Sequence, residues 1–89
     1  MCRNIRALFN FEPPATDAEI RAAAVQFVRK LSGFNKPSKL NEAVWDQAIA
    51  DVTDAARQLI TSLVTSTGPR DREVEAARAR ARAALRFKA

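Results

Sequence analysis

The 89-residue sequence contains no histidine and no tyrosine, and it has only one cysteine and two glycines. Without histidine, nucleophilic catalysis by a Ser–His or Cys–His pair is excluded, and so is a metal site with an imidazole ligand. The glycines, Gly33 and Gly68, lie too far apart to form a glycine-rich phosphate loop. One cysteine cannot form an internal disulfide. These absences argue against most common enzymes, and we expect no metal and no cofactor.

The sequence also lacks long hydrophobic runs. No apolar stretch approaches the roughly 20 residues of a membrane-spanning helix, and the N-terminus lacks the apolar core of a secretory signal. Hydrophobic residues make up 47% of the chain and charged residues 28%, which is typical of globular proteins. At this length the composition predicts a single domain, residues 1–89, with one modest core. We expect a cytoplasmic protein without a membrane partner, and the composition leaves the oligomeric state open.

A first helix is predicted over residues 16–33. Thr16 and Glu19 have the spacing of a capping box, in which each side chain bonds to the backbone N–H of the other residue. Gly33 is placed to end the helix in a left-handed conformation, and Phe34 would pack back onto the last turn of a Schellman motif. The apolar residues recur at helical spacing: Ile20, Ala23, Ala24, Phe27, Val28 and Leu31.

Two further helices are predicted, over residues 38–66 and 69–86. Ser38 or Asn41 is placed to cap the second helix, and Gly68-Pro69 separates it from the third. Two apolar sets recur every seven residues in the second helix, as in the seam of a helical bundle: Trp45, Val52 and Leu59, and Ile49, Ala56 and Leu63. The inward stripe of the third helix is predicted to comprise Val74, Ala77, Ala81 and Leu85.

Residues 1–15 form an arm that ends at Pro13-Pro14. Its apolar residues suit either a short helical turn or a strand, and both alternatives remain open. Together the elements predict an all-α fold: a small bundle of three main helices with the N-terminal arm packed across it. The residues expected to be buried together are Phe27, Leu31, Trp45, Val52, Leu59 and Leu63.

Positive charge is concentrated near the C-terminus. Residues 70–89 contain six arginines and Lys88 against three carboxylates, while the whole chain has a net charge of +5. Within the third helix, a row along one side consists of Arg72, Arg78, Arg82 and Arg86. Guanidinium groups one turn apart can contact successive phosphates, which favours nucleic acid or another polyanion as the partner. The alternative is a solvated basic face that opposes the helix dipole.

Two smaller groups of residues are further candidates. A basic and aromatic cluster, Lys30, Phe34, Lys36 and Lys39, surrounds the turn between the first two helices and suits phosphate or a base. At the N-terminus, removal of Met1 would expose the thiol and α-amine of Cys2, and Arg3 and Arg6 would lower the pKa of that thiol. The alternatives are a helix-end contact for Phe34 and a small buried apolar side chain for Cys2.

Several segments resemble a known family of short bacterial proteins, catalogued as domain of unknown function 2277. They are Met1–Ile5, Asn10–Thr16, Val28–Phe34 with Lys36–Ser38, and Arg72–Ala77. The resemblance implies a stand-alone bacterial cytosolic protein. It implies no activity and assigns no catalytic or binding residue.

The sequence therefore leaves the function unknown. The interpretation that we favour is a small non-enzymatic interaction module that binds nucleic acid or another polyanionic partner through its basic C-terminal helix. The alternatives are a redox or metal-chelating role for the Cys2 thiol, a protein partner, and a homo-oligomeric structural protein.

Overall fold

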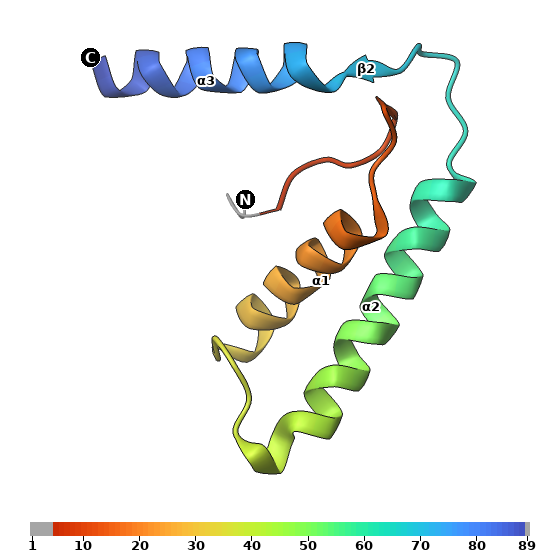
Figure 1. The fold of residues 1–89 in the computed structure, drawn as a ribbon, viewed down its shortest axis with the longest axis vertical. Coiled ribbons are helices and arrows are strands. Elements are labelled where there is room, and N and C mark those ends of the chain that lie inside the picture. The colour runs from red at the N-terminus through yellow and green to blue at the C-terminus, as the bar shows by residue number, and fades with distance from the viewer. Residues whose placement is uncertain (1–4, 89) are drawn as a thin grey trace.

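The computed structural model describes residues 5–88, and the side chains of residues 5–85. Its elements follow in the order β1 (Phe11–Glu12), α1 (Asp17–Ser32), a 3-10 turn (Lys39–Asn41), α2 (Glu42–Ser62), β2 (Arg70–Asp71) and α3 (Arg72–Lys88) (Figure 1). The predicted all-α class with three main helices and an N-terminal arm is confirmed. No described helix is both long and apolar enough to cross a membrane.

Helix α1 begins and ends at the residues that the sequence indicated. The capping box is present: the N–H of Glu19 donates to Thr16 Oγ1 over 3.2 Å, and the N–H of Thr16 donates to Glu19 Oε1 over 2.9 Å. Gly33 has a φ of 78°, and its N–H donates to the carbonyl of Arg29. The N–H of Phe34 donates instead to the Ser32 hydroxyl, and Phe34 is exposed. The end is therefore the simpler left-handed cap, and the predicted Schellman contact of Phe34 is wrong.

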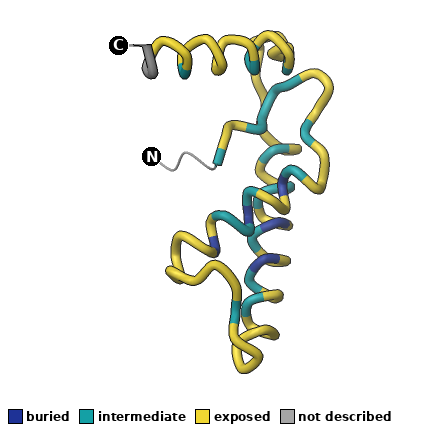
Figure 2. The backbone as a smooth tube through the Cα atoms, turned by 60° about the vertical axis from the view of Figure 1, so that its left-hand side comes forward, coloured by how far each residue is buried: buried dark blue, intermediate teal, exposed yellow. Residues whose placement is uncertain are grey.

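Helices α1 and α2 pack against each other as an antiparallel hairpin, and the core lies between them (Figures 1 and 2). Thr53 is the buried polar residue of this core, and its hydroxyl donates to the carbonyl of Ile49 over 2.6 Å. The bond satisfies the hydroxyl within its own helix, so it does not need water. The buried apolar residues are Ile20, Ala24, Val28 and Ile49.

The core predicted from the sequence is largely wrong. Four of its six members are exposed, with exposed fractions of 43% for Phe27, 72% for Leu31, 59% for Leu59 and 46% for Leu63. The other two, Trp45 and Val52, are half-buried. The prediction placed all three helices in one bundle. In the described part of the chain, α3 lies elsewhere, and the hairpin buries only the residues along its own seam.

The N-terminal arm lies between the hairpin and α3 (Figure 1). Its strand β1 pairs in parallel with β2, with Phe11 opposite Arg70, which decides the open choice between a turn and a strand at these residues. Asn10 has a φ of 66°, and its side-chain amide donates to the carbonyls of Thr67 and Gly68. These bonds anchor the arm to the segment that leads into α3.

Helix α3 faces the arm with a different side from the one predicted. Val74 and Leu85 of the expected inward stripe are 47% and 69% exposed, and Ala77 and Ala81 are exposed as well. The residues nearer the arm are Arg72, Glu75 and Ala76, which are half-buried. The orientation follows from the start of the helix, because Arg72 pairs with Glu19 of α1 and directs its own side of α3 toward the arm and α1.

Candidate polyanion-binding cleft

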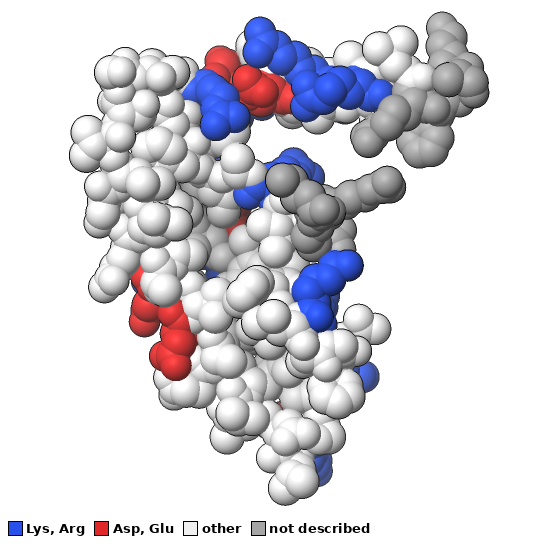
Figure 3. All heavy atoms as spheres, turned by 180° about the vertical axis from the view of Figure 1, so that it is seen from behind, with Lys and Arg blue, Asp and Glu red and all other residues white. Residues whose placement is uncertain are grey.

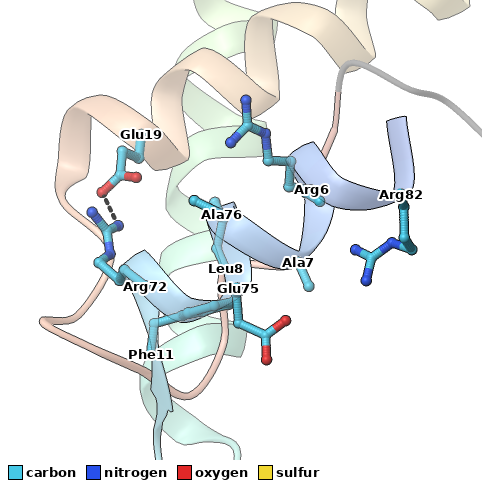
Figure 4. A pocket seen from close by; sticks show the side chains of 10 residues that line it. Arg6, Ala7, Leu8, Phe11, Glu19, Arg72, Glu75, Ala76 and Arg82 are labelled. Atoms are coloured by element: carbon cyan, nitrogen blue, oxygen red, sulfur yellow. Dashed lines mark hydrogen bonds and ion pairs between the residues drawn. The ribbon is translucent and has the colours of Figure 1, made fainter. Parts of the chain in front are cut away.

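A cleft of about 420 Å³ lies between the arm and α3, with the first turn of α1 at one side (Figure 4). Three separate segments of the chain therefore build it. Its charged lining consists of three arginines and two carboxylates, and its apolar lining comes from the arm and from alanines of α3. The lining residues are Arg6, Ala7, Leu8, Phe11, Glu19, Arg72, Glu75, Ala76, Ala79 and Arg82.

Glu19 joins the first turn of α1 to the first turn of α3. Its carboxylate accepts hydrogen bonds from the backbone N–H of Thr16 and from the Arg72 guanidinium, shown by the dashed line in Figure 4. The bond from Thr16, followed by that from Arg72, holds the pKa of Glu19 below its ordinary value of 4.5. The carboxylate is therefore ionised at neutral pH, and the guanidinium of Arg72 is already engaged within the chain.

The start of α3 is fixed by two further contacts. The Asp71 carboxylate accepts a hydrogen bond from the N–H of Val74 over 3.0 Å, which caps the helix. One residue earlier, the Arg70 guanidinium lies 5.0 Å from the centre of the Phe11 ring, within the range of a cation–π contact. Because both contacts lie beside the β1–β2 pair, they fix the direction in which α3 extends from β2.

Arg6 and Arg82 are the cationic residues of the cleft that remain available. Both are exposed, and no ion pair joins either of them to a carboxylate among the described side chains. The second carboxylate of the cleft, Glu75, accepts a hydrogen bond from Arg78 over 3.3 Å. Both carboxylates therefore have cationic partners, while two guanidinium groups from different elements border the same cleft without one (Figure 4).

This arrangement suits a ligand that carries both negative charge and a flat apolar group. The volume falls within the usual range of small-ligand sites, roughly 300–1,000 Å³. Exposed guanidinium groups can donate forked hydrogen bonds to phosphate, and the apolar lining can accept a ring. Within the described residues, no group of three or more potential metal-binding side chains occurs.

The structure separates the four predicted arginines of α3. Arg72 is bound to Glu19 and serves as a link between helices. Arg78 pairs with Glu75 but keeps 65% of its side chain exposed. Arg82 lines the cleft. The side chain of Arg86 lies outside those that the structure describes.

The other predicted clusters lie apart from the cleft. The basic and aromatic cluster at the α1–α2 turn lies at the opposite end of the molecule from α3 (Figure 1). All of its members are exposed: Lys30, Phe34, Lys36 and Lys39. The predicted thiol site cannot be compared, because Cys2 and Arg3 lie outside the described residues. Its third member, Arg6, is described and lines the cleft.

Sequence reasoning missed the role of the arm in building the cleft. Arg6 was considered only as a neighbour of the thiol, and Glu19 only as a capping residue. One signal was present in the sequence: asparagine tolerates positive φ better than most residues, and Asn10 has a φ of 66°. The pairing of the arm with Arg70–Asp71 has no comparable signal, because a two-residue strand leaves no periodic pattern.

A comparison with protein-family models gives one match. Residues 1–78 match the model of DUF2277, described as an uncharacterized conserved protein. The chain belongs to this family. The match includes the arm, α1, α2 and the first turns of α3, and it ends before Arg82. No curated protein and no solved structure matches the chain. The family description assigns no function, so the function must be argued from the cleft.

Proposed function

We propose that this protein is a small, non-enzymatic, bacterial cytosolic interaction module that binds single-stranded nucleic acid along the arm and α3. The binding residues are Arg6, Arg78 and Arg82, and Arg72 positions α3 through its ion pair with Glu19. The observation that carries the proposal is that Arg6 of the arm and Arg82 of α3 line the same cleft, with no carboxylate partner among the described side chains.

The apolar lining favours a single strand over a duplex. Unpaired bases can enter a cleft and stack on apolar or aromatic side chains, whereas the bases of a duplex are already stacked on one another. Leu8 and Phe11 supply the apolar surface, and the guanidinium groups supply the phosphate contacts. The net charge of +5 adds a general attraction to any polyanion and speeds association.

The proposal is tested by the binding of a fluorescent mixed-sequence single strand at low salt. Replacing both Arg6 and Arg82 with Gln should weaken binding by roughly a hundredfold or more, since each charge-assisted hydrogen bond contributes on the order of 1.5–3 kcal/mol. The matched control is Arg21→Gln with Arg29→Gln, which removes the same charge from exposed residues of α1. An equal loss in both variants would reduce the effect to net charge, and an absence of binding by the wild-type protein would refute the proposal.

A further inference from the structure

Within the part of the chain that the structure describes, one side of the α1–α2 hairpin is uncovered although it is apolar. We define the hairpin face as Phe27 and Leu31 of α1 together with Trp45, Val52 and Leu59 of α2. Phe27, Leu31 and Leu59 are 43%, 72% and 59% exposed. Trp45 and Val52 are half-buried. Large apolar side chains that gather on one surface commonly mark an interaction site.

The position of these residues follows from helix geometry. The Arg57 Nε donates to Asp17 Oδ1 over 2.9 Å, which places a polar bridge on one side of the seam between α1 and α2. At 100° per residue, Phe27 lies on the other side of the buried residues of α1, whereas Leu31 lies in line with Ile20 and Ala24 and is exposed in the last turn of the helix. The same construction places Trp45, Val52 and Leu59 on the far side of α2 from Arg57. Phe27 and the three residues of α2 therefore share one side of the hairpin, and Leu31 borders that side at the end of α1.

The two helices that form the edges of the hairpin differ in charge. Viewed from behind, the molecule shows a largely uncharged surface over the hairpin, with acidic side chains at the α2 edge and basic ones at the α1 edge (Figure 3). Helix α2 has four carboxylates against the single cation Arg57, whereas α1 has three cations against Asp17 and Glu19. A surface that complements the hairpin would carry basic groups opposite α2 and acidic groups opposite α1.

We propose that the hairpin face binds the same face of a second copy of the chain, which forms an antiparallel four-helix bundle. A twofold axis parallel to the helices places α1 of one copy over α2 of the other, so the acidic helix faces the basic one. An axis perpendicular to the helices would place α2 over α2, and their carboxylates would repel one another. Charge complementarity thus favours a second copy in the first orientation, through an isologous interface.

The register of the hairpin predicts what would meet at this interface. Asp17 bonds to Arg57, so Trp45 lies level with residue 29 of α1. In the proposed dimer, Trp45 of the second copy would therefore lie between Phe27 and Leu31. Such contacts would complete the burial that the sequence pattern indicated for these residues, with the second copy in place of α3.

Sedimentation equilibrium of the full chain tests the proposal. The expected mass of the wild-type protein is twice the 9.8 kDa of one chain, and Leu31→Arg should reduce it to 9.8 kDa. Leu85→Arg is the matched control, because Leu85 on α3 is 69% exposed, close to the 72% of Leu31, but lies outside the hairpin face. This control should remain dimeric.

Emission from Trp45, the only tryptophan, provides a second readout. It should shift to longer wavelength in Leu31→Arg and stay unchanged in Leu85→Arg, while circular dichroism checks that both remain helical. If Leu31→Arg unfolds, Leu59→Arg replaces it. A monomeric wild-type protein at its highest soluble concentration would overturn the proposal. So would a dimer that Leu85→Arg dissociates and the hairpin-face variants leave intact.

Discussion

Glu19 has two roles at the scale of a single residue. It completes the capping box of α1 and also accepts the hydrogen bond from Arg72 that ties α3 to α1. The capping role can be read from the spacing of Thr16 and Glu19 alone. The link to Arg72 cannot, because the two residues are 53 positions apart and meet only after the arm has paired with β2.

The lowered pKa of Glu19 predicts a dependence of stability on pH. Because the folded state favours the ionised carboxylate, the unfolded chain binds the proton at higher pH than the folded chain. The stabilisation is therefore fully present above pH 4.5, the ordinary pKa, and is lost as the pH falls through the lower pKa of the folded state. We expect the urea midpoint of Glu19→Gln to be lower than that of the wild-type protein at pH 7 and to converge with it in acid. A constant difference at all pH values would contradict this linkage.

Cys2 gives a second prediction at this scale, and it rests on the sequence alone. If Met1 is removed, intact-mass measurement should show its loss, and Cys2 beside Arg3 and Arg6 should react with iodoacetamide with a thiol pKa below the ordinary value of about 8.5. Arg3→Gln should return the reactivity toward that of a free thiol. Retention of Met1, or ordinary reactivity in the wild-type protein, would remove the thiol hypothesis.

Among the helices, the signals that mark helix ends were predicted correctly from the sequence, and the packing of the helices against one another was not. The capping box and the left-handed Gly33 depend on neighbouring residues, and the sequence was sufficient to identify both. Which side of each helix packs against the rest of the chain could not be predicted in the same way. The heptad spacing of Trp45, Val52 and Leu59 correctly indicates one apolar side of α2, but it does not reveal whether anything in the chain covers that side.

The two glycines provide a matched test of the α1 end. Gly33 has a φ of 78°, whereas no positive φ is found at Gly68, and a Cβ added at either position would meet no atom within 4 Å. Gly33→Ala should therefore destabilise the protein by about 1–2 kcal/mol through backbone strain alone. Gly68→Ala should be nearly neutral. Urea unfolding measures both, and equal effects would show that the conformation of Gly33 does not limit stability.

At the scale of the whole molecule, the arm determines where α3 lies. The sequence predicted three helices and an arm, and the class is correct, but it predicted that the third helix packs into the bundle through a stripe that includes Val74 and Leu85. The arm instead occupies the space between the hairpin and α3 and holds α3 through Asn10 and the β1–β2 pair. This placement creates the cleft at Arg6 and Arg82, and it leaves the hairpin face uncovered by the described residues.

We propose that the arm and α3 act together as one surface for phosphate groups. The slope of log affinity against log salt for a single-stranded oligonucleotide tests it most directly, because the slope changes by about −0.7 for each phosphate contacted. We predict that Arg6→Gln and Arg82→Gln each flatten the slope by about one contact and together by about two, while Arg21→Gln leaves it unchanged. A slope that responds to Arg82 alone, or to neither arginine, would contradict a shared surface.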